Sequence, residues 1–130
     1  MRPGRGIALL CSAYVLAGCG ATPHQQVEAK VQEFARATAN RNYAALCNDV
    51  LAPALVAHLT AAGLSCEQAM RVFVSSVQNP SISVSKVTVH GSSASAVVLA
   101  SATGQPAAIE SIELIDTNHG WRLASLASPR

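Results

Sequence analysis

The hydrophobic pattern of this chain changes its period at Asn79-Pro80, and this change restricts the fold more than any other feature. Before it, apolar residues recur every three or four positions, as on one face of a helix. After it, apolar and polar residues alternate, as in strands with one buried face. Helices followed by antiparallel strands indicate an α+β domain with helices packed on one face of a curved, four-stranded sheet. A length of 130 residues suits a single domain.

The helical half carries two start signals. Thr22-Pro23-His24-Gln25 combines an N-cap, a proline at the first helical position and a glutamine that closes a capping box, and Ser65-Cys66-Glu67-Gln68 is a second capping box. The first signal predicts a helix that buries the stripe Val27, Val31, Phe34, Ala35 and Thr38. The second predicts a helix that ends near Val77 and carries the apolar stripe Cys66, Met70, Phe73, Val74 and Val77.

Two shorter helices are expected between these signals. One runs from about Tyr43 to Leu51, and the other begins at Pro53 and ends toward Gly63, a residue suited to a C-terminal cap.

The second half predicts four strands. The first contains Ile82, Val84, Val87 and Val89, and its alternation slips by one position near Ser85-Lys86, as a β-bulge would cause. The others are expected at 94–102, 107–116 and 121–126, with turns at 90–92, 103–106 and 118–120.

Residues 1–18 have the parts of a secretory signal. MRPGRG carries two arginines, the apolar run IALLCSAYVLAG follows, and small residues precede Cys19. The run is shorter than the about 17 to 25 apolar residues that a transmembrane helix needs. We therefore expect residues 1–18 to be a signal peptide that is removed after export.

The four residues Leu16-Ala17-Gly18-Cys19 resemble the lipobox of bacterial lipoproteins, in which a branched apolar residue and two small residues precede a cysteine. The resemblance implies that the Cys19 thiol receives a diacylglycerol, that a peptidase cuts before Cys19, and that the new amine is acylated, for example with palmitate. Two or more acyl chains anchor a protein stably. The alternative is ordinary signal cleavage after Ala21, which would release a soluble product.

Lipidation fixes the expected location and layout. The protein would be anchored to the cell membrane and face its extracytoplasmic side. Residues 19–22 would form a lipidated tether that spans about 10 Å at full extension, and residues 23–128 would form the single folded domain.

Two of the four cysteines remain after processing. Cys11 leaves with the signal peptide and Cys19 carries lipid, so Cys47 and Cys66 face an oxidising compartment and predict a disulfide. A zinc site of Cys47, His58 and Cys66 would lack the close ligand pairs typical of structural zinc. A nucleophilic cysteine would need an exposed electropositive setting, whereas both cysteines lie on apolar stripes. We expect no metal and no cofactor.

The order of elements and the closing residues 119–126, HGWRLASL, resemble the NTF2-like superfamily. This is a cone-shaped fold that also holds ketosteroid isomerases and many small secreted bacterial domains. Residues 40–47, NRNYAALC, look like the family's link between its first two helices. The resemblance covers about residues 23–127 and implies that Gly120 permits a tight turn and that Trp121 covers one end of the core.

Enzymes of this superfamily use polar groups inside the cone, typically an aspartate base with a tyrosine or a protonated acid as donor. Tyr43 lies on an apolar stripe, and His90 and Asp116 lie beside turns. Glu110 and Glu113 are three positions apart and point to opposite faces of a regular strand, so one of them could enter the cone. No catalytic pair can be assembled from these residues, and we expect no enzymatic activity.

The remaining candidates are surface residues and partners. The histidines lie near turns or helix ends, where we expect exposed side chains: His24, His58, His90 and His119. From Cys19 onward the basic and acidic residues are equal in number, which argues against a nucleic-acid partner.

Three functions remain, in this order. The first is a non-catalytic, lipid-anchored module that binds a protein or a second copy of itself through an apolar sheet face. The second is a carrier of a small apolar ligand, because the strands are rich in alanines that fill little space: Ala94, Ala96, Ala100, Ala107 and Ala108. The third is a ketosteroid-isomerase-like enzyme. A filled core would favour the first function, an apolar cavity the second, and a cavity with convergent polar groups the third.

Overall fold

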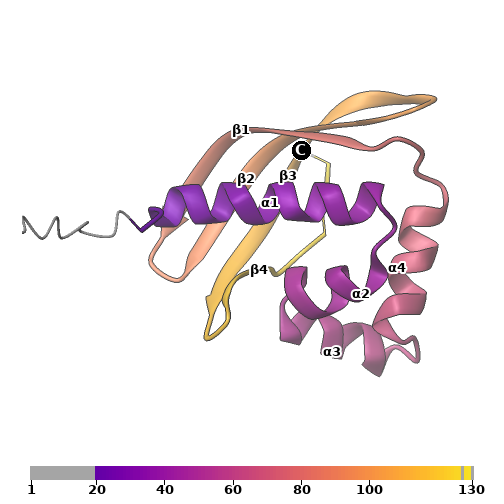
Figure 1. Cartoon of the computed structure of the whole chain (residues 1–130), viewed down its shortest axis with the longest axis horizontal. Coiled ribbons are helices and arrows are strands. Elements are labelled where there is room, and N and C mark those ends of the chain that lie inside the picture. Colours follow the sequence, from indigo (N-terminus) through magenta and orange to yellow (C-terminus); the bar gives the residue numbers. More distant parts are fainter. Residues whose placement is uncertain (1–19, 127, 130) are drawn as a thin grey trace, which may run out of the picture.

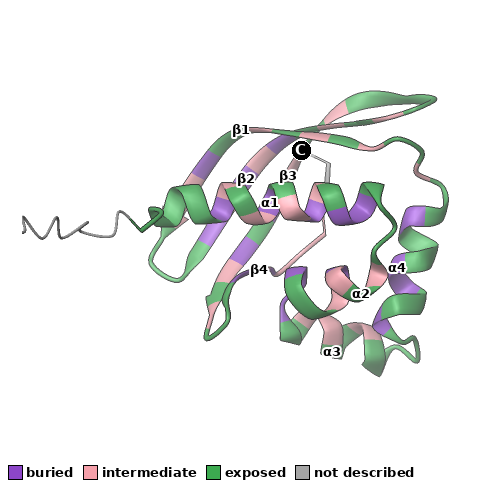
Figure 2. Ribbon diagram, viewed as in Figure 1, coloured by how far each residue is buried: buried purple, intermediate pink, exposed green. Residues whose placement is uncertain are grey.

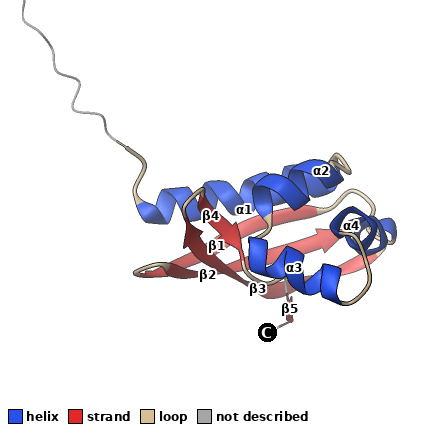
Figure 3. Ribbon diagram, turned by 90° about the horizontal axis from the view of Figure 1, so that it is seen from below, coloured by secondary structure: helices blue, strands red, loops and turns tan. Residues whose placement is uncertain are grey.

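The computed structural model describes residues 20–126 and 128–129, and it has the α+β architecture that the change of period predicts. The helix α1 lies across one face of an antiparallel sheet, and α2, α3 and α4 gather near the C-terminal half of α1 (Figures 1 and 3). The helical elements are α1 (Pro23–Ala39), α2 (Tyr43–Ala45), the π-helical turn η1 (Leu46–Val50), α3 (Pro53–Ala61) and α4 (Cys66–Ser75). The strands are β1 (Ser81–His90), β2 (Ser93–Ala102), β3 (Gln105–Thr117), β4 (Gly120–Leu123) and the short β5 (Ser128–Pro129).

Both capping boxes are confirmed. The Gln25 amide donates to Thr22 Oγ1 at 3.2 Å while the Thr22 amide donates to Gln25 Oε1 at 3.1 Å. Ser65 and Gln68 make the same reciprocal pair at the start of α4. Each box satisfies amides that the first turn of a helix leaves without partners, and this is why α1 and α4 begin where the sequence indicates.

The buried stripe of α1 differs from the prediction at one position. Val27, Val31, Phe34 and Thr38 are buried as expected, but Ala35 is only half-buried and Ala37 is buried instead. The helix therefore turns a slightly different face to its neighbours near its C-terminal end, where Asn42 donates its amide to the Ala37 carbonyl.

The prediction of one continuous helix from about Tyr43 to Leu51 is wrong. A single α-turn ends at Ala45, and the chain continues as a π-helical turn to Val50. The Leu51 amide donates to the Leu46 carbonyl, five residues back, and Ala52 then donates to the carbonyl of Leu123 in β4. The wider turn thus places Ala52 beside β4 at the edge of the sheet. The periodicity of the sequence does not predict this contact, because it depends on a distant strand.

The sheet is a meander with the order β1-β2-β3-β4. The predicted bulge in β1 is confirmed, because the register with β2 shifts between Val84 and Lys86. β3 begins at Gln105 rather than at Ala107, since Ala102 pairs directly with Gln105 across a two-residue turn. Gly104 has a φ of +76°, which such a tight hairpin turn requires and a glycine adopts without strain.

The predicted last strand from Trp121 to Leu126 is interrupted. β4 ends at Leu123, where the amides of Ala124 and Ser125 both donate to the carbonyl of Glu113. Two residues on this strand thus oppose one on β3, which is the arrangement of a bulge. Pairing with β3 resumes in β5.

The core lies between α1 and the sheet, and Figure 2 shows buried segments in the helices and in the strands. We call the part of the core that is built by α1, η1, β2, β3 and β4 the closed end. There α1, η1, β2, β3 and β4 contribute side chains that are at most 3% exposed, namely Val27, Val31, Leu46, Val50, Ala94, Ala96, Ile112, Leu114 and Leu123. Trp121 is 4% exposed, which confirms its expected place in the core.

Candidate functional site

The opposite end of the interface between α1 and the sheet contains a pocket of about 410 Å³, and we call this region the pocket end. Its walls come from the last turns of α1 and α4, the start of β1, the end of β2 and the start of β3. The apolar residues that line it are Phe34, Phe73, Val77, Pro80, Ile82, Ala100, Ala102, Pro106 and Ala108, and the polar ones are Thr38, Ser81, Ser101, Gln105 and Glu110.

Small side chains create this space. Ala100 of β2 lies directly opposite Ala108 of β3 on the face toward α1, whereas the next pairs along the same two strands include Val98, Ile112 and Leu114. Ala94 and Ala96 are also small, but larger neighbours cover them and leave them at most 3% exposed. The alanine content therefore produces a cavity only where two alanines face each other across the strands.

Hydrogen bonds hold one wall of the pocket to the β2–β3 hairpin. The Thr103 amide donates to the Gln78 carbonyl at 2.8 Å, and Gln105 Nε2 donates to the Ser76 carbonyl at 3.3 Å. Asn79, whose φ of 48° is left-handed, donates from Nδ2 to Thr103 Oγ1 at 3.2 Å. These contacts fix the linker between α4 and β1 against the hairpin, so the pocket has a defined rim.

Of the five polar residues that line the pocket, two are not exposed, and they come from opposite layers. Thr38 belongs to the last turns of α1 and is 4% exposed, and Glu110 belongs to β3 and is half-buried. Among the described residues, the Thr38 hydroxyl oxygen has no hydrogen-bond partner. A buried hydroxyl without a partner is costly, so this position is a candidate for ligand contact.

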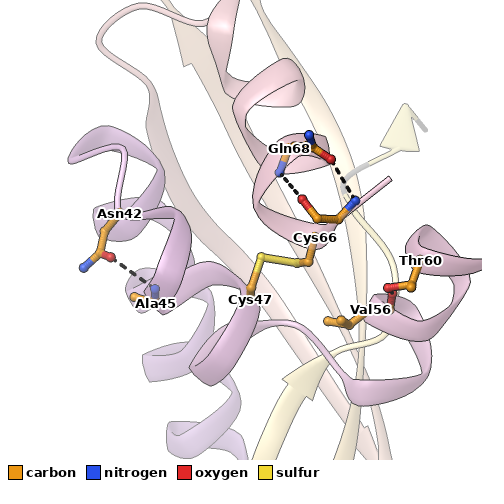
Figure 4. The surroundings of a disulfide bond; sticks show 8 residues. Asn42, Ala45, Cys47, Val56, Thr60, Cys66 and Gln68 are labelled. Carbon is orange, nitrogen blue, oxygen red and sulfur yellow. Dashed lines mark hydrogen bonds between the residues drawn. A yellow bond between two sulfur atoms is a disulfide. The ribbon is translucent and has the colours of Figure 1, made fainter. Parts of the chain in front are cut away.

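The predicted disulfide between Cys47 and Cys66 is confirmed (Figure 4). The bond joins η1 to the first residue of α4, with the two Cα atoms 5.9 Å apart. Near the bond, Asn42 Oδ1 accepts the Ala45 amide and the capping box fixes the start of α4, as Figure 4 shows. The disulfide thus ties the helix that lines the pocket to the packed closed end.

The structure separates the two glutamates that the sequence left as alternatives. Glu110 lies in the face toward α1 and lines the pocket. Glu113 is exposed and pairs in register with Ser95, and Ser111 Oγ donates to its Oε1 at 3.4 Å. Asp116 is exposed beside the β3–β4 turn.

The other candidate residues lie away from the pocket. Each of the four histidines is exposed as predicted: His24, His58, His90 and His119. Tyr43 is half-buried, and the guanidinium carbon of Arg71 lies 4.7 Å from the centre of its ring. Tyr43 and Arg71 therefore form a contact between α2 and α4, and neither residue lines the pocket.

Several predictions fall outside what the structure describes. Cys19, the signal peptide of residues 1–18 and its cysteine Cys11 lie outside the described residues. Among the described helices, none is both long enough and apolar enough to cross a membrane. No group of three His, Cys, Asp or Glu side chains suited to a metal ion occurs among the residues that the structure describes.

Comparison with known proteins gives no relative: no family model, no curated protein and no solved structure matches this chain.

Sequence reasoning missed two residues of the pocket. Thr38 and Phe73 were expected only as members of buried stripes, yet both line the cavity, and Phe73 is 37% exposed. A threonine in an otherwise apolar stripe is a visible signal, because its hydroxyl needs a partner in any packed core. The exposure of Phe73 depends on where α4 ends relative to the sheet, which no local pattern encodes.

Proposed function

We propose that this protein binds a small, mainly apolar ligand in the pocket between α1 and the sheet. The observation that carries the proposal is the cavity itself, whose volume of about 410 Å³ lies within the range of small-molecule sites. Its lining is mostly apolar with a few polar groups, which is the usual composition of such sites. The proposal is one of binding without catalysis, in keeping with the sequence prediction.

The hollow pocket end is the reason for preferring a carrier over the other functions. The pocket is partly open to solvent, so a small molecule can enter it, and a concave, mainly apolar site of this kind is what a carrier needs. The fold is also proposed to be NTF2-like, with this pocket as the interior of the cone. The support for this is the helix-then-meander order and the closing Gly120-Trp121.

A matched pair of variants on β3 tests the proposal. Ala108 lines the pocket, whereas its neighbour Ala107 is exposed and belongs to the other face of the strand. Titration with n-octanol, followed by amide NMR of the full chain, should shift signals of pocket residues. Ala108→Leu should abolish these shifts by filling the space, and Ala107→Leu should preserve them. Absence of binding to the unaltered protein, or equal loss in both variants, would refute the proposal.

We also propose that the protein is anchored through lipid on Cys19 and works on the extracytoplasmic side of the cell membrane. The support is the sequence of residues 1–19 together with the start of α1 at Pro23, which leaves a tether of only a few residues. Incorporation of a labelled fatty acid should occur in the unaltered chain and disappear in Cys19→Ala. Labelling that persists in the variant would contradict the assignment.

A second candidate function is self-association through the sheet face that points away from α1. On this face Leu99 and Ile109 lie directly opposite each other, and they are 46% and 58% exposed. Anchoring in one membrane plane would raise the local concentration of copies, which favours contact between them. Sedimentation of the full chain should show dimers that Leu99→Ser with Ile109→Ser abolishes. A monomer at every concentration would exclude this candidate.

A further inference from the structure

A carboxylate lies on the face of β3 toward α1, between the buried residues Ile112 and Leu114 and the pocket-lining Ala108. On the face of β3 toward α1, the alternating residues are Ala108, Glu110, Ile112 and Leu114. Ile112 and Leu114 are at most 1% exposed, and Val98, the register partner of Glu110, is 0% exposed. Glu110 itself is half-buried, so it loses part of its hydration, and a cationic partner would offset that loss.

No such partner is present among the side chains that the structure describes. The one ion pair found there joins Lys30 to Glu33, and neither residue lines the pocket. Lys, Arg and His are absent from the residues that line the cavity. The pocket wall therefore carries a carboxylate beside apolar surface, and no basic side chain lines the same pocket; Arg41 lines an adjoining hollow that shares Thr38, Val77 and Pro80 with it.

Thr38 supplies a second polar group from the opposite layer. In α3, Thr60 follows the common pattern and donates its hydroxyl to the Val56 carbonyl one turn back, at 3.0 Å. Thr38 makes no such bond and has an inaccessible hydroxyl oxygen. A helical threonine has two accessible χ1 rotamers, and we infer that one of them turns the Thr38 hydroxyl toward the pocket. Thr38 can thereby offer a hydrogen-bond acceptor to a ligand.

We propose that the ligand is a small organic monocation, namely an alkyl or aryl amine. This inference rests on the proposed function and specifies its ligand class. The apolar body would lie against Phe34, Ile82 and the alanine pair Ala100 and Ala108, and the ammonium group would donate to Glu110. A single carboxylate matches one positive charge, so a polyamine would leave further charges unpaired against apolar walls. A ligand with a carboxylate would be repelled by Glu110.

The test compares three ligands of equal chain length: n-octylamine, n-octanol and n-octanoate. Each is titrated into the full chain at low ionic strength near pH 7, with affinity measured by calorimetry and location by amide NMR. We expect n-octylamine to bind about tenfold more tightly than n-octanol, since hydrogen bonds to charged groups exceed neutral ones by an amount of this order. n-Octanoate should bind more weakly than n-octanol.

Variants locate the source of this preference. Glu110→Gln should lower the affinity for n-octylamine about tenfold, to that for n-octanol, and leave n-octanol unchanged. Glu113→Gln removes the same charge from the other face of β3 and should change neither affinity. If Glu110→Gln alters the amide spectrum globally, Glu110→Asp keeps the charge and should retain the preference for the amine.

Thr38→Val separates hydrogen bonding from charge. This substitution should lower the affinity for n-octylamine a few-fold. It should not change the affinity for octyltrimethylammonium, which has no N–H group. If n-octanol binds but n-octylamine binds no more tightly, or if Glu110→Gln keeps the preference, the amine inference is wrong while the proposed function stands. If none of the three probes binds, both are wrong.

Discussion

The two ends of the interface between α1 and the sheet share strands β2 and β3 and differ in what covers these strands. At the closed end, η1 adds Leu46 and Val50 and β4 adds Leu123 beside β3, and every one of these side chains is fully buried. At the pocket end, the last turns of α1 and α4 and the linker after α4 approach the sheet, and a pocket of about 410 Å³ remains. The comparison teaches that the closed end supplies stability, which leaves the pocket end available for binding.

The largest loss of stability is expected when a large side chain at the closed end is shortened. Leu114→Ala should lower the free energy of unfolding by about 4 kcal/mol, because it removes a fully buried leucine and leaves a cavity. Ile109→Ala, on the same strand but 58% exposed, serves as control and should cost below about 1 kcal/mol. Urea unfolding measures both. Similar losses would show that the closed end does not dominate stability.

Removal of the disulfide, which connects the two ends, is expected to cause the second largest loss of stability. Cys47→Ala with Cys66→Ala should lower the free energy of unfolding by about 3 kcal/mol, since the bond closes a loop with a sequence separation of 19. Reduction of the unaltered protein provides the matched comparison and should give a loss of similar size. A loss below about 1 kcal/mol would mean that packing alone holds α4 in place.

The same substitution at each end tests the comparison directly. Ala96→Leu should lower the free energy of unfolding by about 2 kcal/mol, because Ala96 is 0% exposed and its neighbours leave no room. Ala108→Leu should change it by less than about 0.5 kcal/mol, since the added atoms enter the pocket. Thermal unfolding of the pair measures the difference. Equal costs at the two sites would contradict the presence of space at the pocket end.

The smallest expected effect on stability is an increase, caused by a substitution at the pocket wall. Thr38→Val should raise the free energy of unfolding by about 1 kcal/mol, because valine has a similar shape and removes a buried hydroxyl that has no partner among the described residues. Thr60→Val is the control, and should give no gain because the Thr60 hydroxyl is already bonded to the Val56 carbonyl. Chemical denaturation detects the difference. A loss of stability in Thr38→Val would indicate that the hydroxyl has a structural partner.

Local rules explain which parts of the fold the sequence predicts well. The capping boxes at Thr22 and Ser65, the bulge beside Ser85 and the change of period at Asn79-Pro80 each depend on a few adjacent residues. The disulfide also follows from local information, because removal of Cys11 and lipidation of Cys19 would leave one pair. The break after Leu123 does not follow, since it is defined by the distant carbonyl of Glu113.

The candidate site also has features that the sequence predicts and features that only the tertiary structure decides. Sequence alone determined the α+β class and the cysteine pair, and it placed Glu110 and Glu113 on opposite faces of one strand, because periodicity and spacing are properties of the chain itself. Only the tertiary structure decided that Glu110 faces the pocket, that Ala100 meets Ala108, and that Thr38 and Phe73 lie beside them. These outcomes depend on strand register and on where two helices end over the sheet. Both are set by packing between segments far apart in the chain.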